Sequence, residues 1–210
     1  MGRVAAIFDV DQTLVRGHTE RLFFWHLLRR GGLTMPQALN FLGRLSRQPR
    51  NRFRDKSYLG GLWVEDAHRL ARECYEECIA PRLSGPGLAC VREHQVRGHE
   101  IVLLTGSLAF LLLPLKETLN AAWLIATEIE RSNGRFTGEI AGLHPRGENK
   151  RRLLLELSRA QGLDLTQSYA YGDHIEDLHI FRVIGNPVVV NPSWRLKRLA
   201  QKYRWPIRYF

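Results

Sequence analysis

Runs of consecutive apolar residues recur along the chain at residues 4–8, 101–104, 169–171 and 187–190. A strand with one exposed face alternates apolar and polar residues, whereas a continuous apolar run is typical of a strand covered on both faces. The four runs therefore predict strands in the interior of a parallel sheet.

Segments in which apolar residues repeat with helical spacing lie between or after these strands. They span residues 87–95, 108–119, 150–160, 175–183 and 193–203. Strands that alternate with helices are joined by right-handed crossovers. We therefore expect an α/β fold, in which a doubly wound, Rossmann-like parallel sheet is covered by helices.

Two regions depart from this alternation. Residues 16–83 contain no predicted strand, and apolar residues have helical spacing in them at 22–28 and again at 67–78. This segment predicts an inserted all-helical subdomain, with residues 1–15 and 84–210 forming the α/β core. Apolar and polar residues alternate between Ile125 and Ile140 on either side of Asn133 and Gly134. Asn-Gly favours the type I′ turn of a β-hairpin, so we expect a hairpin there.

The composition is that of a folded chain with one core. The sequence has 210 residues, of which 44% are hydrophobic and 25% charged, and this length accommodates one domain with an insertion. The apolar stretch 101–115 is interrupted by Gly106 and Pro114 and is too short to cross a bilayer. The N-terminus lacks a signal-peptide pattern, so we expect a cytoplasmic protein.

Three cysteines are an odd number, which does not favour a disulfide framework. The spacings Cys74-x3-Cys78 and Cys90-x3-His94 have the composition of a structural zinc site. Cysteines four residues apart on an amphipathic helix are more commonly small core residues, and we expect that role here.

Basic residues dominate two regions of a chain whose net charge is +10. Residues 29–56 contain eight basic side chains against Asp55 alone, and no acidic residue follows Asp177. Such regions attract phosphates, nucleic acid or anionic lipid, although each run is also compatible with a solvated helix face.

Polar residues stand where the predicted strands end. They are Asp9 and Asp11 after the first strand, Thr105, Gly106 and Ser107 after the second, and Asp173 and Asp177 after the third. The carboxyl ends of parallel strands meet at one edge of a sheet, where ligands of doubly wound folds bind. We therefore expect these residues to converge on one crevice.

The residue types suit phosphoryl transfer. A carboxylate can attack phosphorus once cations neutralise the phosphoryl oxygens, and a second carboxylate two residues later can handle protons. The hydroxyls and N–H groups at 105–107 can hold phosphate oxygens at a helix N-terminus, or Ser107 can simply cap that helix. Lys150 can supply a positive charge, and Asp9 with Asp173 can bind Mg²⁺. Asp177 can orient Lys150 or a metal-bound water.

These motifs, in this order, resemble the haloacid dehalogenase superfamily of phosphohydrolases, specifically its branch related to phosphoserine phosphatase. They read DxDxT at 9–13, Thr105-Gly106-Ser107, Lys150, and GDxxxD at 172–177. The resemblance covers essentially the whole chain and implies a phosphoric monoester hydrolase that uses Mg²⁺ and forms an aspartyl-phosphate intermediate. It also implies that 16–83 is a helical cap that closes over the crevice and contacts substrate.

The resemblance implies a role for each matching residue. Asp9 is expected to be the nucleophile and a metal ligand, and Asp11 the general acid and base with its backbone carbonyl on the metal. Asp173 is expected to complete the metal site, with Thr13 and Asp177 supporting it. Thr105, Gly106 and Ser107 are expected to hold phosphate, and Lys150 to neutralise it.

Two positions depart from the family pattern. The glutamate that receives the amino group in phosphoserine phosphatases is replaced by His18, which we expect to contact substrate instead. Glu20 lies two residues further on and is expected to face another way on a helix. Glu176 stands where the acidic loop usually has asparagine. We therefore expect a small phosphate ester as the partner molecule, with no strong preference for phosphoserine.

Other functions remain open on the sequence alone. A basic, aromatic cap is compatible with a lipid-like phosphate on an anionic membrane, held by weak electrostatic association. The aromatic residues concerned are Phe23, Phe24, Trp25, Phe41, Phe53 and Tyr58. A non-catalytic protein that binds phosphate or nucleic acid, and phosphoryl transfer between two organic groups, are further alternatives, although we expect no specific nucleic-acid partner. The oligomeric state is not indicated.

Overall fold

The computed structural model describes residues 2–47 and 54–210. Its centre is a seven-stranded sheet with the order β4-β3-β2-β1-β5-β6-β7, parallel except for the antiparallel pair β3 and β4. The strands are β1 (Ala5–Phe8), β2 (Glu100–Leu108), β3 (Trp123–Ser132), β4 (Arg135–Ala141), β5 (Tyr169–Gly172), β6 (Asn186–Val190) and β7 (Ile207–Arg208). The predicted α/β class with a doubly wound sheet is confirmed.

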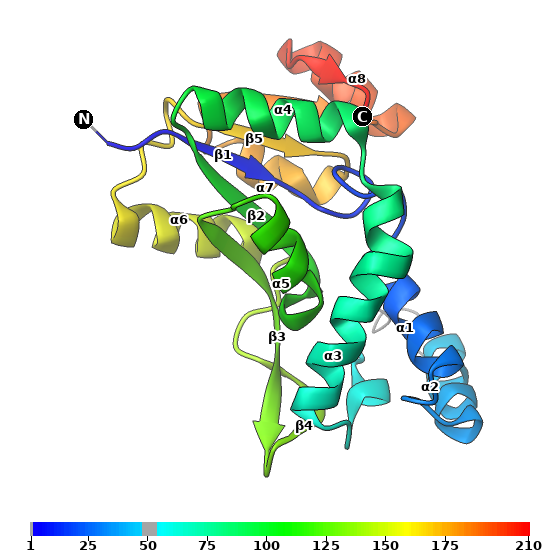
Figure 1. Ribbon diagram of the computed structural model, residues 1–210. Helices are drawn as coiled ribbons and strands as arrows, with labels where there is room; N and C mark the ends of the chain where they lie inside the picture. Colours follow the sequence, from blue (N-terminus) through cyan, green and yellow to red (C-terminus); the bar gives the residue numbers. More distant parts are fainter. Residues whose placement is uncertain (1, 48–53) are drawn as a thin grey trace.

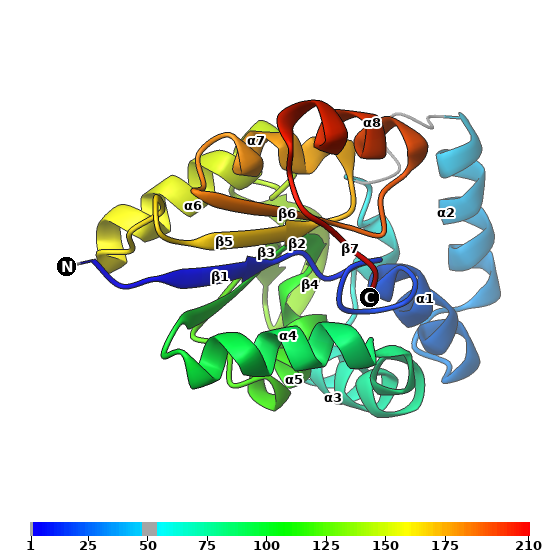
Figure 2. The ribbon, with the colours of Figure 1, turned by 90° about the horizontal axis from the view of Figure 1, so that it is seen from above.

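Helices cover both faces of the sheet, as Figure 2 shows. They are α4 (Gly85–Val96) and α5 (Ala109–Thr118) on one face, and α6 (Glu148–Gln161), α7 (Leu178–Phe181) and α8 (Trp194–Tyr203) on the other. Ala6 and Phe8 of β1 pack toward α4 and α5, while Ala5 and Ile7 pack toward the opposite layer. Because successive side chains of a strand point to opposite faces, an entirely apolar β1 serves both layers.

Three local predictions were wrong in their boundaries. Strand β2 continues to Leu108, with an irregular register against β3 after Leu104, so α5 begins only at Ala109. Ser107 consequently lies in the strand and does not cap the helix. The helix predicted at 175–183 is a 3₁₀ turn, Ile175–Asp177, followed by the short helix α7. Strand β7 was not predicted, because two residues are too few to show an apolar run.

The predicted hairpin is formed by β3 and β4. Asn133 and Gly134 connect the strands, both with positive φ values of 50° and 75°. A type I′ turn requires this left-handed conformation at both central positions, which explains the Asn-Gly pair. The hairpin extends beyond the rest of the sheet (Figure 1) and binds the inserted segment, because Phe136 N donates to Leu62 O at 2.9 Å.

The regular elements described between β1 and α4 are helices and helical turns, joined by loops and by isolated β-bridges. They are α1 (Thr19–Arg29), α2 (Met35–Arg47), a 3₁₀ turn (Ser57–Leu59), α3 (Val64–Cys74), a π-helical turn (Tyr75–Ile79) and a second 3₁₀ turn (Ala80–Arg82). These elements lie beyond the carboxyl ends of the strands (Figure 1). The division at residues 15 and 84 into core and cap stays a prediction.

Among the described residues, no helix combines the length and the apolar character needed to cross a membrane.

Candidate active site

The carboxyl ends of β1 and β5 bring together acidic residues that are far apart in the sequence. Asp9 follows β1 and is anchored there because its N–H donates to Tyr171 O at 2.9 Å. Asp173 follows β5, and Asp177 lies in the next turn. Carboxylate oxygens of Asp9, Asp173 and Asp177 all lie within 4.8 Å of one another.

Lys150 reaches this cluster from the first turn of α6. Its Nζ donates to Asp9 Oδ1 at 2.7 Å and to Asp177 Oδ1 at 2.8 Å, and all three side chains are largely buried. Three carboxylates beside one ammonium leave two negative charges uncompensated when all are ionised. The cluster therefore calls for a further cation.

The loop after β5 is shaped around Asp177. Its Oδ2 accepts a hydrogen bond from His174 N at 3.1 Å while Oδ1 holds Lys150. A Cβ atom on Gly172 would lie 2.5 Å from Asp177 Oδ2, so only glycine permits this close approach. Thr13 Oγ1 donates to Asp173 Oδ1 at 3.3 Å and joins the first acidic loop to the second.

Asp11 is held by the beginning of α1. Its Oδ1 accepts hydrogen bonds from Thr19 N at 2.9 Å and Thr19 Oγ1 at 2.7 Å. Ser107 Oγ lies 2.7 Å from Thr19 Oγ1, and since the threonine hydrogen is used on Asp11, Ser107 is the donor of this pair. Asp11 thus connects the first loop, the helical segment and β2.

Thr105 and Gly106 lie beside the acidic cluster in β2. Thr105 Oγ1 accepts a hydrogen bond from Ser107 N at 3.2 Å, and Gly106 O accepts one from Thr127 Oγ1 at 2.7 Å. A Cβ atom on Gly106 would stand 3.1 Å from Arg146 Cγ, so the glycine lets that side chain approach the strand.

The pKa values of the acidic groups reflect burial without enough positive charge. Burial raises the pKa of Asp9 to about 6, although Lys150 opposes the shift, and burial raises the pKa of Asp11 to about 6. The pKa of Asp173 rises to about 8 through burial and the neighbouring carboxylates. Burial alone would lower the pKa of Lys150, but Asp177 and Asp9 outweigh it and raise that pKa.

These shifts and the donor set fit a hard divalent cation. Such an ion prefers carboxylate and carbonyl oxygens, and its charge would offset the repulsion that raises the carboxyl pKa values.

A cavity of about 830 Å³ opens above the cluster. The strand ends form its floor through Asp9, Asp11, Thr105, Gly106, Ser107, Lys150 and Asp173. The helical segment forms its wall through His18, Glu20, Arg21, Phe24, Trp25, Phe41, Leu42 and Tyr58. All the predicted catalytic, phosphate-binding and metal-binding residues therefore border one space, together with His18.

The predicted orientation of Glu20 was wrong. His18 and Glu20 both line the cavity, because His18 precedes the first residue of α1 and helical spacing does not apply between them. Glu20 is already engaged there: Lys56 Nζ donates to its carboxylate at 2.6 and 2.7 Å, and Tyr58 OH donates at 3.0 Å. Its negative charge is therefore matched within the protein.

The aromatic residues that raised the membrane alternative are mostly buried. Phe23, Phe24, Phe41 and Tyr58 are each less than 9% exposed, and Trp25 is 47% exposed. Phe53 lies outside the described residues. In place of an aromatic outer surface, these side chains supply the core of the helical segment and one wall of the cavity.

Sequence reasoning missed residues in the loop before α6. Arg146 pairs with Glu176 through Nε at 3.0 Å and Nη2 at 2.9 Å, and this ion pair fixes the residue that departs from the family pattern. His144 Nδ1 lies 2.8 Å from Thr127 Oγ1, whose own hydrogen is used on Gly106. His144 therefore carries its proton on Nδ1, and burial lowers its pKa to about 4. The only signal was the position of this loop at the same edge of the sheet.

Comparison with known proteins finds similar sequences and a similar solved structure. A phosphoserine phosphatase of Mycobacterium tuberculosis is 29% identical over 217 residues, spanning 98% of this chain and 70% of the relative. A histidinol-phosphatase of Neisseria meningitidis is 28% identical over 217 residues, spanning 98% of both chains. A solved protein of unknown function from Bordetella pertussis superimposes with a TM-score of 0.86 at 25% identity, over 99% and 98% of the two chains.

A family of known proteins also matches most of the chain. The haloacid dehalogenase-like hydrolase family matches residues 6–182, which include the strand ends of β1, β2 and β5 that border the cavity. The resemblance drawn from the four motifs is thereby confirmed, and this chain belongs to the haloacid dehalogenase-like hydrolase family.

Proposed function

We propose that this hydrolase is a Mg²⁺-dependent phosphatase that cleaves a small organic phosphate monoester through an aspartyl-phosphate on Asp9. The observation that carries the proposal is the contact of Asp9 with Lys150 inside an acidic cluster, directly below a cavity. A buried carboxylate held by an ammonium is positioned as a nucleophile, and the cavity leaves room for the ester above it.

The first half-reaction forms a bond from an Asp9 oxygen to phosphorus and breaks the bond from phosphorus to the ester oxygen. Asp11 gives its proton to that leaving oxygen. In the second half-reaction water attacks the phosphorus, Asp11 accepts its proton, and inorganic phosphate leaves with Asp9 restored. A pKa of about 6 suits a group that must both donate and accept near neutral pH.

The phosphate oxygens are held by groups of the cavity floor. Thr105 Oγ1 accepts from Ser107 N, so its own hydrogen can be donated to a phosphate oxygen. Gly106 and Ser107 present backbone beside it, and Lys150 supplies positive charge. When bound, Mg²⁺ supplies further charge neutralisation; Asp9, Asp173 and the backbone carbonyl of Asp11 would hold it, with Thr13 and Asp177 fixing the two loops.

Residues 16–83 act as the cap in this proposal, because the cavity wall comes from α1, α2 and the turn at Ser57–Leu59. Closure of such a segment would exclude water from the first half-reaction. A cytoplasmic location remains a prediction.

Trapping of the intermediate tests the mechanism. We expect Asp11→Asn to form the aspartyl-phosphate from an activated aryl phosphate, whose leaving group needs no proton, and to hydrolyse it about 10²–10⁴-fold more slowly than wild type. Acid quenching and mass spectrometry should show an added phosphoryl mass on the peptide that contains Asp9.

Asp9→Asn is the matched control, since it changes one oxygen two residues away and should carry no label. Label on a serine, threonine or histidine, or undiminished turnover by Asp9→Asn, would refute the mechanism. Full activity after exhaustive chelation would refute the part that concerns Mg²⁺.

A specific observation bears on the organic part of the substrate. Phe24, Trp25, Phe41 and Tyr58 give the cavity an aromatic wall, and Lys56 neutralises the one carboxylate on that wall. An amino acid side chain as small as that of phosphoserine leaves such a wall uncontacted. We therefore propose a phosphate ester with a ring, and the related histidinol-phosphatase makes histidinol phosphate the first compound to test.

Steady-state kinetics with histidinol phosphate and phosphoserine separate these substrates. We expect kcat/KM to be at least about tenfold higher for histidinol phosphate, and Trp25→Ala to lower it about fivefold or more, since a desolvated aromatic contact is worth about 1 kcal/mol or more. Trp194→Ala, which changes an exposed tryptophan on α8 outside the cavity, is the control. A preference for phosphoserine would contradict the proposal that the aromatic wall selects an ester with a ring.

A further inference from the structure

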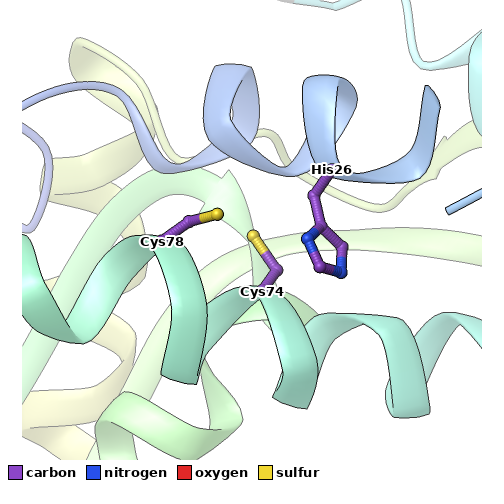
Figure 3. A group of neighbouring side chains, drawn as sticks. All are labelled: His26, Cys74 and Cys78. Atoms are coloured by element: carbon purple, nitrogen blue, oxygen red, sulfur yellow. The ribbon is translucent and has the colours of Figure 1, made fainter. Parts of the chain in front are cut away.

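A second cluster of chemically reactive side chains lies inside the helical segment, apart from the residues that border the active-site cavity. His26 of α1 faces Cys74, the last residue of α3, and Cys78 of the π-helical turn (Figure 3). One imidazole nitrogen and both sulfur atoms lie within 4.8 Å of one another, and all three residues are buried.

The local structure explains why the two thiols converge. Residues four apart on a helix lie on the same face, so Cys74 and Cys78 both point toward α1. The chain between them changes from α- to π-helical, and single π turns are frequent at functional sites. The four-residue zinc pattern considered from the sequence is not assembled: Cys90 accepts from Arg208 at 3.5 Å and His94 bonds Tyr171 at 2.8 Å.

His26 has an unusual environment for a buried imidazole. His26 is 0% exposed, yet neither its Nδ1 nor its Nε2 has a hydrogen-bond partner among the described residues. A buried polar group without a partner costs free energy, and native proteins rarely leave one in that state. The two ring nitrogens are therefore available to bind a ligand from outside the protein.

We propose that His26, Cys74 and Cys78 form a structural site for Zn²⁺ or a similar thiophilic divalent cation, which clamps α1 to α3. Two thiolates and one imidazole are the soft and intermediate donors that zinc selects, whereas Mg²⁺ prefers oxygen. In a tetrahedral site the donor atoms are about 3.5–3.8 Å apart, so donors now within 4.8 Å would each need to move by less than about 1 Å.

Two carboxylates complete the set of donors. Glu77 Oε2 lies 3.7 Å from His26 Nδ1, and Glu73 Oε2 lies 3.8 Å from Nε2. Whichever nitrogen binds the ion, one carboxylate is next to it as a fourth ligand, and the other is next to the remaining N–H. Metal-binding histidines usually donate that second N–H to a carboxylate, which orients the ring.

The surrounding charges and protons balance. Binding of the cation displaces one proton from each thiol, and burial lowers the pKa of His26, which favours the neutral imidazole that a metal ion binds. Arg29 Nη2 lies 3.5 Å from Cys78 Sγ and donates to it, which stabilises a thiolate. Arg30 pairs with Glu73 and Glu77, and these three side chains are partly exposed.

Cobalt titration of the reduced, metal-free full chain tests the site. Excess Mg²⁺ is present to occupy the oxygen cluster, and the readout is the sulfur-to-cobalt charge-transfer absorption, which oxygen ligands do not produce. We expect this absorption to saturate at one Co²⁺ per chain, to vanish on addition of one equivalent of Zn²⁺, and to be accompanied by release of two protons.

Variants assign the ligands. Cys74→Ser, Cys78→Ser and His26→Gln should each weaken binding about 100-fold or more, since loss of an outer partner alone costs about 10–100-fold. Of Glu73→Gln and Glu77→Gln, the variant of the fourth ligand should weaken binding as the other ligand variants do, and the variant of the outer partner should fall in the lower range of about 10–100-fold. Cys90→Ser removes the third buried cysteine and should bind Co²⁺ as wild type does.

Circular dichroism establishes that each variant is folded, and a Zn²⁺-dependent rise in melting temperature provides a second measurement on wild type. No thiolate absorption in folded wild type, or equal absorption in the three ligand variants, would overturn the proposal and leave the cluster as core packing. Loss of the absorption in Cys90→Ser would overturn the assigned ligands. None of these outcomes depends on phosphatase activity, so the proposed function stands or falls separately.

Discussion

The two buried clusters of this protein differ in every property that decides which cation they suit. The cluster at the sheet edge consists of oxygen donors, Asp9, Asp173 and Asp177, with Lys150 inserted among them. The cluster between α1 and α3 consists of one imidazole and two thiols, with charged groups only at its margin. One site is electrostatically incomplete, and the other has unpartnered polar atoms.

The comparison shows that the position of each cluster in the fold, and not its donor type, determines whether a bound cation can contact substrate. Loops after parallel strands place carboxylates at the bottom of an open cavity, where a substrate can reach them. Packed helices enclose their donors, so an ion held there can fasten α1 but cannot meet substrate. Mutations should therefore separate catalysis from thiolate binding in both directions.

The largest effect should come from Asp9→Asn. An amide is a poor nucleophile, so kcat should fall about 10⁴-fold or more, because loss of a nucleophile leaves only the surrounding binding groups. The thiolate-cobalt absorption should be unchanged. His26→Gln should show the reverse pattern, with the absorption lost and kcat retained within about tenfold, since this residue lies outside the cavity.

Parallel measurement of kcat and cobalt absorption on both variants checks this separation. A loss of thiolate absorption in folded Asp9→Asn would show that the two clusters are not independent.

An intermediate effect should come from Thr19→Ala. Thr19 Oγ1 donates to Asp11 Oδ1 at 2.7 Å and stabilises the carboxylate, so its loss should raise the pKa of Asp11 above about 6, by about one unit. The protonated acid then persists to higher pH, and the basic limb of kcat/KM should move upward. Hydrolysis of the aspartyl-phosphate near pH 6 should slow about fivefold, because the ionised fraction of Asp11 falls and this step needs the base.

A pH profile of kcat/KM with a poor leaving group measures the shift. Thr118→Ala, which removes a threonine hydroxyl that donates to Pro114 O at the end of α5, is the control and should leave the profile in place. An unshifted profile in Thr19→Ala would mean that Asp11 does not set that limb.

The smallest effect concerns stability of the oxygen cluster without metal. The pKa of Asp173 is about 8 in the folded protein and 3.8 in an unperturbed chain, so the unfolded state binds fewer protons between these values. Stability of the metal-free protein should therefore fall as pH rises through this window. Asp173→Asn removes the buried carboxylate, and its melting temperature at pH 8 should exceed that of wild type by about 2–4 °C for each kcal/mol gained in the free energy of unfolding. At pH 4 the two melting temperatures should no longer differ.

Thermal denaturation in chelator at the two pH values checks this sign, and Mg²⁺ should reverse the order at pH 8 by stabilising wild type alone. A less stable Asp173→Asn at pH 8 in chelator would show that Lys150 already compensates the cluster.

Much of the fold and the active site followed from local patterns. The apolar runs predicted four of the seven strands, and the Asn-Gly pair located the hairpin, because burial on both faces and left-handed φ values restrict the residue types allowed. The positions of Asp9, Thr105 and Asp173 after strands predicted their convergence, since parallel strands share one carboxyl edge.

Errors arose where distant segments determine the outcome. The end of β2 depends on an irregular pairing with β3, which no pattern within 101–108 reveals. Glu20 enters the cavity because Lys56 and Tyr58 hold it there, and both come from another part of the chain. His144 was overlooked because its significance depends on Thr127 and burial.

The sequence by itself determined the α/β alternation, the helical insertion and the motif order, because each depends on periodicity and spacing within a short window. Only the tertiary structure decided which side chains share an environment: it placed His26 beside Cys74 and Cys78 and gave Lys150 two carboxylates. The physical reason is that burial, charge and hydrogen-bond satisfaction depend on neighbours brought together by packing, and their separation along the chain does not encode that proximity.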